Sequence, residues 1–172
     1  MKKDLSLPIP IISDALPDND ALVDNNQRTA KKAVKILVAK DNNIYKDLSA
    51  AEKRNLVIAF AFKDKIVYGK AFDLVKLENK ASVDFSDIND IQQKIKNIIV
   101  CEIKSTNKKT KRDNFEGYFF GLSTAELLVA QNLKSNYRFI FVNVLTEDIL
   151  ELTLKQIFEK AKGIYPQWSI SF

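Results

Sequence analysis

The chain has 172 residues, of which 46% are hydrophobic and 28% charged, and its net charge is +5. This composition is typical of one folded domain with a substantial core and argues against disorder. There is no histidine and a single cysteine, Cys101, which excludes histidine-based triads, Cys-His nucleophiles and the usual zinc sites. Any chemistry must therefore use carboxylates, lysines or a bound metal ion.

The lone cysteine and the positive charge bear on location and partners. One cysteine cannot form an intramolecular disulfide, so we expect a reducing compartment and a cytoplasmic protein. No apolar run approaches the roughly 18 residues that a membrane helix needs, and we expect no membrane span. A basic chain favours polyanionic partners without identifying one.

The first part of the chain predicts an arm followed by two helices. Residues 1–23 contain three prolines and turn-forming residues, which is typical of an arm on the surface. Apolar residues at helical spacing predict a helix over residues 24–40. Ser49 and Glu52 form a capping-box pattern at the start of a second helix, although the apolar stretch 56–62 is also compatible with a strand.

The middle of the chain is richer in strand-forming residues. Residues 66–78, "IVYGKAFDLVKLE", predict one bent strand or two short ones, and a short helix follows around residues 88–95. The stretch "NIIVCEIK", residues 97–104, predicts a buried strand that ends in charged residues, and residues 104–114 predict a polar, basic loop.

The last part predicts a helix, a strand and a second helix. Ser123 and Glu126 form a further capping box, with Ala125, Leu128, Val129 and Leu133 on the predicted inner face. Residues 137–144, "YRFIFVNV", predict a central strand covered on both faces, and residues 147–162 a C-terminal helix. We therefore expect an α/β fold in which helices flank a central mixed sheet, with one domain over residues 24–172 and its core in residues 66–145.

Three charged residues in otherwise apolar segments predict a site. Alternation places Glu102 and Lys104 on one face of their strand, about 7 Å apart at its carboxyl-terminal rim, while Ile103 stays in the core. Asp73 is a carboxylate in the neighbouring apolar segment. Two carboxylates and the backbone carbonyl of Ile103 are oxygen ligands that suit Mg²⁺, and Lys104 can stabilise negative charge on a phosphodiester in hydrolysis.

The order of these segments resembles the PD-(D/E)XK nuclease superfamily, in the style of restriction-type enzymes. The resemblance covers residues 66–145 and matches Asp73, Glu102 and Lys104 to the three motif positions; Phe72 stands where proline is common. It implies an α/β/α core, a magnesium-dependent endonuclease of the restriction or defence type, double-stranded DNA as substrate, and a homodimer. The alternatives are a DNA repair or junction-resolving nuclease, a non-catalytic nucleic-acid-binding module on the same fold, and a small-molecule-binding α/β domain whose charged strand end is incidental.

Several assignments stay open at this level. Glu102 and Lys104 are also compatible with a surface ion pair, and the stretch 78–80, "ENK", is a second E-x-K pattern. Three further aspartates compete with Asp73 for the first acidic position. A basic run after the predicted site strand is either a solvated loop or a set of DNA phosphate contacts. The competing aspartates are Asp84, Asp87 and Asp90, and the basic residues are Lys108, Lys109, Lys111 and Arg112.

Overall fold

The protein folds around a five-stranded mixed sheet with helices on both sides, which confirms the predicted α/β fold class. The structure, a computed structural model, describes residues 19–109 and 115–165. The strands lie in the order β1-β2-β3-β4-β5, and β3 runs antiparallel to β2 and parallel to β4. The elements in chain order are α1 (Asn19–Lys40), β1 (Tyr45–Lys46), α2 (Ala50–Ala61), β2 (Leu74–Leu77), α3 (Ile88–Lys94), η1 (Ile95–Asn97), β3 (Ile98–Thr106), α4 (Thr124–Leu133), η3 (Lys134–Asn136), β4 (Tyr137–Asn143), β5 (Ile149–Leu152) and α5 (Leu154–Lys160).

Strand β3 lies at the centre of the sheet and divides its side chains between two cores. Ile98 and Val100 belong to the larger cluster of buried residues, whereas Ile99, Cys101 and Ile103 belong to the smaller one. This is the alternation that a strand buried on both faces requires. The same alternation places Glu102 and Lys104 on the side of the larger core.

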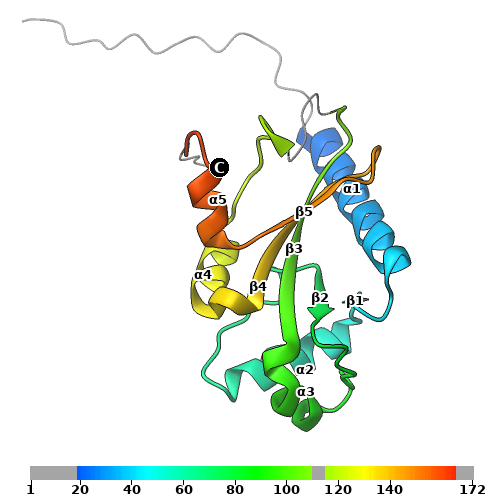
Figure 1. Ribbon diagram of the computed structural model, residues 1–172, viewed down its shortest axis with the longest axis vertical. Helices are drawn as coiled ribbons and strands as arrows, with labels where there is room; N and C mark the ends of the chain where they lie inside the picture. The colour runs from blue at the N-terminus through cyan, green and yellow to red at the C-terminus, as the bar shows by residue number, and fades with distance from the viewer. Residues whose placement is uncertain (1–18, 110–114, 166–172) are drawn as a thin grey trace, which may run out of the picture.

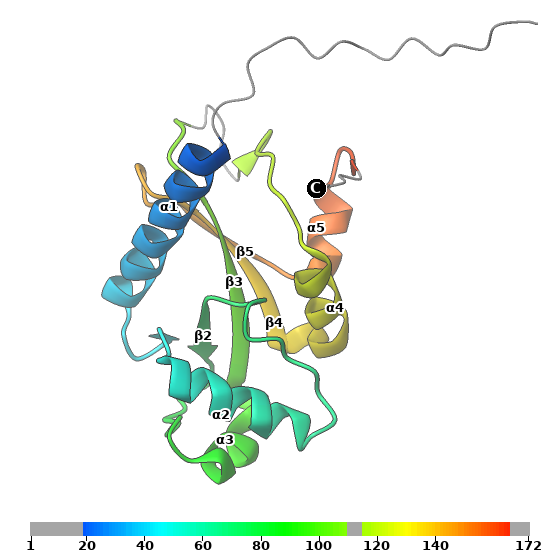
Figure 2. The same ribbon diagram turned by 180° about the vertical axis from the view of Figure 1, so that it is seen from behind.

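The two faces of the sheet are covered by different helices. Helix α1 lies along one face and contributes Ala33 and Leu37 to the smaller core (Figure 1). Helices α4 and α5 lie on the opposite side, and α2 and α3 pack at one end of the sheet (Figure 2). Helix α2 adds Leu56, Ala59 and Phe60 to the larger core, which confirms the helical alternative for residues 56–62.

Three of the described helices begin with a complete capping box. The boxes are Ser49 with Glu52 in α2, Ser123 with Glu126 in α4, and Thr153 with Gln156 in α5. In each box the first side chain accepts a hydrogen bond from the backbone of the third helical residue, whose own side chain accepts one in return. The first two boxes confirm helix starts that the sequence predicts.

Several predicted boundaries and faces are wrong. Helix α1 begins at Asn19, before the predicted start, and the rest of the predicted arm lies outside the described residues. Of the segment 66–78 only residues 74–77 form a strand, because a turn closed by the hydrogen bond from Ala71 to Tyr68 interrupts it. The segment 147–162 contains strand β5 before helix α5.

The inner face of α4 also differs from the prediction. Leu128 is exposed, whereas Val129, Ala130 and Leu133 are buried together with Glu126. A charged residue therefore occupies a core-facing position of this helix. None of the helices in the described ranges is long and apolar enough to cross a membrane.

We expect helix α1 to contribute strongly to stability through Leu37, which is fully buried. Leu37→Ala should lower the free energy of unfolding by about 2 to 5 kcal/mol, because it leaves a cavity between the helix and the sheet. Lys35→Ala, an exposed position on the same helix, should change it by less than about 0.5 kcal/mol. Urea denaturation measures both values, and equal effects would contradict the packing role.

Candidate active site

Asp73 lies immediately before β2, beside the second half of β3. Because β2 runs antiparallel to β3, its first residue, Leu74, pairs with Cys101. The Asp73 amide donates a hydrogen bond to the Cys101 carbonyl over 2.9 Å. The Asp73 carboxylate in turn accepts a hydrogen bond from the Ile103 amide over 2.8 Å. The sheet therefore brings Asp73 next to the residue that separates Glu102 from Lys104.

Glu102 and Lys104 lie on the same face of β3, as alternation predicts, and they contact each other. The Lys104 ammonium lies 3.1 Å from Glu102 Oε1. Their predicted position at the rim of the sheet is wrong, because β3 continues to Thr106 and Glu102 is only 8% exposed. The neighbouring parallel strand β4 pairs with β3 throughout this region, which keeps the two side chains within the body of the sheet.

Two further residues lie in the site, although the sequence did not indicate that they are functional. Glu126 on α4 approaches Lys104 to 2.8 Å, closer than Glu102 does. Lys53 on α2 donates a hydrogen bond to the Asp73 carbonyl over 3.0 Å and lies 5.2 Å from the centre of the Phe72 ring. The capping-box pattern predicted the helical position of Glu126 but gave no sign of its second partner.

Burial changes the acidity of the carboxyl groups. The pKa of Glu102 is raised to about 8, mainly because the side chain is buried and also because Asp73 lies nearby; Lys104 opposes this rise and Glu126 adds to it. The pKa of Asp73 is also raised, mainly by burial, although the backbone hydrogen bond and the nearby lysines lower it. Burial therefore favours the protonated form of Glu102 more than it would for an exposed carboxyl group.

The donor set matches the oxygen ligands that a hard divalent cation prefers. Asp73 and Glu102 supply two carboxylates, and desolvated carboxylates close to one another favour a cation that compensates their charge. The amide and the carbonyl of one strand residue point toward the same neighbouring strand. The Ile103 carbonyl therefore faces the side from which Asp73 approaches. Among the described residues, no three His, Cys, Asp or Glu side chains form a group that could hold a metal ion.

The competing E-x-K pattern at residues 78–80 lies in a turn. Strand β2 ends at Leu77, and the turn is closed by a hydrogen bond from the Ala81 amide to the Glu78 carbonyl. Asn79 and Lys80 both have positive φ values, 55° and 53°, which a strand cannot accommodate. This pattern therefore does not present its two charged residues on one face of a strand.

The three competing aspartates have structural partners near helix α3. Asp84 accepts hydrogen bonds from the backbone and the hydroxyl of Ser86. Asp87 is the N-cap of α3, and Asp90 forms an ion pair with Lys94 at 2.7 Å. These contacts account for the three carboxylates locally and leave Asp73 as the aspartate beside Glu102.

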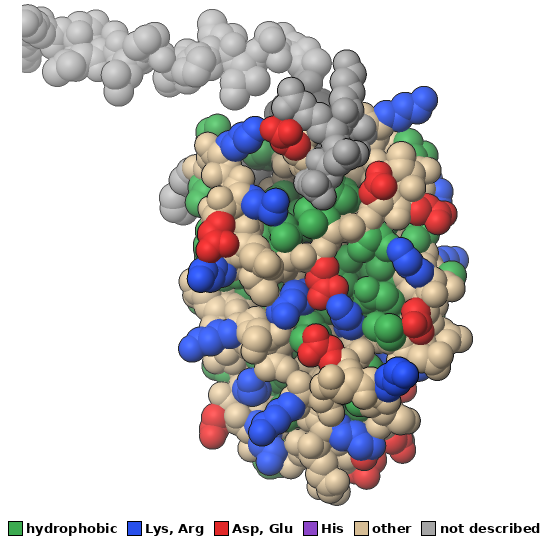
Figure 3. Space-filling view, in the orientation of Figure 1, with side chains coloured by type: hydrophobic (Ala, Val, Ile, Leu, Met, Phe, Trp, Pro, Cys, Tyr) green, Lys and Arg blue, Asp and Glu red, His purple; other side chains and the backbone are tan. Residues whose placement is uncertain are grey.

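The predicted phosphate-binding residues lie just beyond β3. Lys108 and Lys109 are exposed, while Lys111 and Arg112 lie outside the described residues. The Lys108 carbonyl accepts a hydrogen bond from Asn143 over 3.0 Å, which ties this segment to the end of β4. One face of the molecule carries basic and acidic side chains intermixed, without a single basic surface (Figure 3). The net charge alone therefore does not mark a DNA-binding surface on that face.

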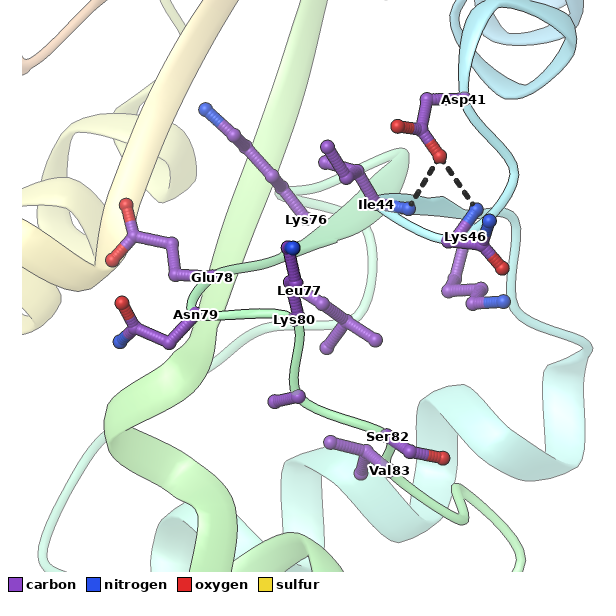
Figure 4. A pocket seen from close by; sticks show the side chains of 12 residues that line it. Asp41, Ile44, Lys46, Lys76, Leu77, Glu78, Asn79, Lys80, Ser82 and Val83 are labelled. Atoms are coloured by element: carbon purple, nitrogen blue, oxygen red, sulfur yellow. Dashed lines mark hydrogen bonds between the residues drawn. The ribbon is translucent and has the colours of Figure 1, made fainter.

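A surface groove lies apart from these residues, between the β1–β2 edge and the turn that follows β2 (Figure 4). Its lining includes Lys46, Lys76 and Lys80. Figure 4 shows the side chains of Lys46 and Lys76 pointing away from each other. Lys76 forms an ion pair with Glu151 at 2.7 Å, so its charge is already compensated. The lysines of this groove do not converge on a ligand, and the groove shares no residue with the carboxylate site.

Comparison of the chain with family models, curated proteins and solved structures gives no match. The geometry of Asp73, Glu102 and Lys104 is therefore the basis for assigning a function. The resemblance to the PD-(D/E)XK nucleases stays a hypothesis that cleavage assays can test.

We expect the buried Glu102 to make stability depend on pH. Its pKa is about 8 in the folded protein and near the ordinary 4.5 in the unfolded chain. Between these values the folded state holds one more proton, so the free energy of unfolding falls as pH rises, by up to about 1.4 kcal/mol per pH unit. Glu102→Gln stays neutral in both states and removes this contribution.

Urea denaturation in the presence of chelator, at several pH values between about 5 and about 8, compares the two proteins. The wild-type stability should fall more steeply with pH than that of Glu102→Gln. Parallel pH profiles would show that Glu102 ionises normally in the folded protein.

Proposed function

We propose that the protein is a magnesium-dependent endonuclease that hydrolyses phosphodiester bonds of double-stranded DNA, most simply of the restriction or defence type. It would act in the cytoplasm as a homodimer, since two active sites are needed to cut both strands together. The proposal combines the sequence resemblance with the geometry of the site. The fold class is compatible with it, because a mixed sheet between helices is the architecture that the resemblance implies.

One observation carries the proposal. The Asp73 carboxylate accepts the hydrogen bond of the Ile103 amide, and Ile103 separates Glu102 from Lys104. Two segments about thirty residues apart thus bring an acid and an E-x-K sequence side by side in the sheet. The competing carboxylates near α3 show no comparable arrangement. This convergence is what a nuclease of this type requires.

Each residue has a distinct proposed role. Asp73 and Glu102 would hold the metal ion through their carboxylates, with the Ile103 carbonyl as a third ligand. Bound magnesium would lower the pKa of a coordinated water and screen the charge of the phosphodiester. Lys104 would orient the attacking water and stabilise the negative charge that develops on the phosphate oxygens.

The alternatives differ in what the same residues do. A repair or junction-resolving nuclease would use the same carboxylates and differ in the DNA structure that it cuts. A non-catalytic nucleic-acid-binding module would keep the exposed Lys108 and Lys109 but show no turnover. Incubation of plasmid and branched DNA with magnesium, and again with chelator, separates these functions.

We expect Lys104→Ala to lower the cleavage rate by about 100- to 1000-fold, because the ammonium stabilises charge in the transition state. DNA binding should stay within a few-fold of wild type.

Asp73→Asn should bind DNA but lose nearly all cleavage at any attainable magnesium concentration, since the neutral amide cannot replace a carboxylate ligand. Gel-based cleavage and fluorescence anisotropy measure the two properties.

The matched controls are Asp84→Asn, Asp87→Asn and Asp90→Asn, which should cut at close to the wild-type rate. Asparagine also caps helices well, so the change at Asp87 should preserve α3. An essential Asp84 with a dispensable Asp73 would move the site to the region before α3. Activity in all four variants would exclude this metal site.

We expect Lys108 and Lys109 to contact DNA phosphates next to the scissile one. Replacing both with serine should weaken binding to all sequences alike and flatten the slope of log K against log salt by about two units. Lys155→Ser with Lys160→Ser, two exposed lysines on α5, provides a control with the same change in charge. An unchanged slope in the first variant would show that the two residues are only solvated.

A further inference from the structure

We infer that Glu126 is a positioning residue for Lys104, and this inference rests on the proposed nuclease function. The Lys104 ammonium lies between two carboxyl groups, 2.8 Å from Glu126 and 3.1 Å from Glu102. The side chains of Lys104 and Glu126 are only 13% and 11% exposed. Shielding from solvent strengthens this ion pair relative to one on the surface.

The fold holds the Glu126 carboxylate in one orientation. Its Oε2 accepts the Ser123 amide over 3.1 Å and the Lys104 ammonium over 2.8 Å. The Glu126 amide donates to the Ser123 hydroxyl over 3.2 Å, which completes the capping box. Helix α4 is itself anchored to the larger core by Val129 and Leu133. A rigid element therefore presents the carboxylate to the lysine.

The two carboxyl partners of Lys104 have different roles. Glu102 lies next to Asp73 and is a proposed ligand of the metal ion, so its oxygens are not reserved for the lysine. Glu126 comes from helix α4, and the capping box of that helix holds its carboxylate in place. Glu126 can therefore keep the ammonium in place when Glu102 is engaged in the site.

Capping alone does not explain a charged residue at this position. The box of α5 makes the same two hydrogen bonds with Gln156, which is neutral. The box of α2 uses Glu52, whose carboxylate accepts the Ser49 amide over 2.8 Å. Among the three boxes of the described helices, only the one in α4 also forms an ion pair with a lysine. The capping box therefore does not require the charge of Glu126, and this charge pairs with Lys104.

Glu126→Gln separates the two roles, because glutamine preserves the capping box and removes the charge. Glu52→Gln is the matched control for this change at the start of a helix. We expect single-turnover cleavage of plasmid DNA by Glu126→Gln with magnesium to fall by about 10- to 100-fold. DNA binding should stay within about twofold, and Glu52→Gln should cut like the wild type.

The magnesium dependence distinguishes positioning from metal ligation. If Glu126 acts through Lys104, raising the magnesium concentration will not restore the lost rate. Recovery at high magnesium would overturn the inference and make Glu126 a metal ligand. Wild-type cleavage by Glu126→Gln would also overturn it while leaving the proposed function intact. A wild-type protein that does not cut DNA with magnesium overturns the proposed function and this role together.

A measurement on the wild-type protein covers the case in which Glu126→Gln does not fold. The ¹⁵N signal of the Lys104 ammonium, assigned by comparison with Lys104→Ala, should keep its coupling to the Glu126 carboxyl carbon after calcium is added in place of magnesium. Loss of that coupling on adding calcium would show that Glu126 does not hold the lysine in the metal-bound protein.

Discussion

The hydrogen bond between the Ile103 amide and the Asp73 carboxylate is the interaction on which the candidate site depends. It forms where β2 begins. The antiparallel pairing of Leu74 with Cys101 places Asp73, the residue before Leu74, beside the Ile103 amide of β3. The hydrogen bond offsets part of the desolvation of Asp73. The Asp73 carboxylate also lies close enough to Glu102 to raise the pKa of that side chain. Without this pairing, Asp73 would be one of several aspartates in polar segments.

The site concentrates charge where the fold could have placed apolar side chains. Three carboxyl groups, from Asp73, Glu102 and Glu126, lie with Lys104 and Lys53 next to the larger core. Burying charged groups costs free energy unless they are paired and hydrogen-bonded, and hydrophobic replacements often give an equal or greater stability. The raised pKa values of Asp73 and Glu102 record this cost. Buried carboxyl groups with raised pKa values, gathered at one place beside a core, are typical of functional sites.

Alternation and helix capping made much of this arrangement predictable. The period of two in "NIIVCEIK" correctly placed Glu102 and Lys104 on one face, because side chains two residues apart point to the same face of any strand. The rim position was wrong because nothing in the sequence shows that the polar residues Ser105 and Thr106 continue the ladder with β4. The strand propensity of a segment depends on its own residues, whereas the length of a strand also depends on the neighbouring strand with which it pairs.

The partner of Glu126 could not be predicted for the same reason. The sequence assigned Leu128 to the inner face of α4 by its hydrophobicity, but the helix turns Val129, Ala130 and Leu133 inward, and that rotation carries Glu126 with them. A glutamate at N3 satisfies a local rule, so the pattern gave no reason to seek a second function. Only the tertiary packing of α4, which contacts the neighbouring strand β4, shows that this carboxylate meets Lys104.

The site is built from elements that come from different parts of the chain. Asp73 immediately precedes β2, whereas Glu102 and Lys104 come from β3, Glu126 from α4 and Lys53 from α2. These elements share the larger core, so packing that stabilises the fold also fixes the distances within the site. A site on rigid elements is held more accurately than one on loops. The loops are then left to contact the substrate, and the exposed lysines directly after β3 lie on such a segment.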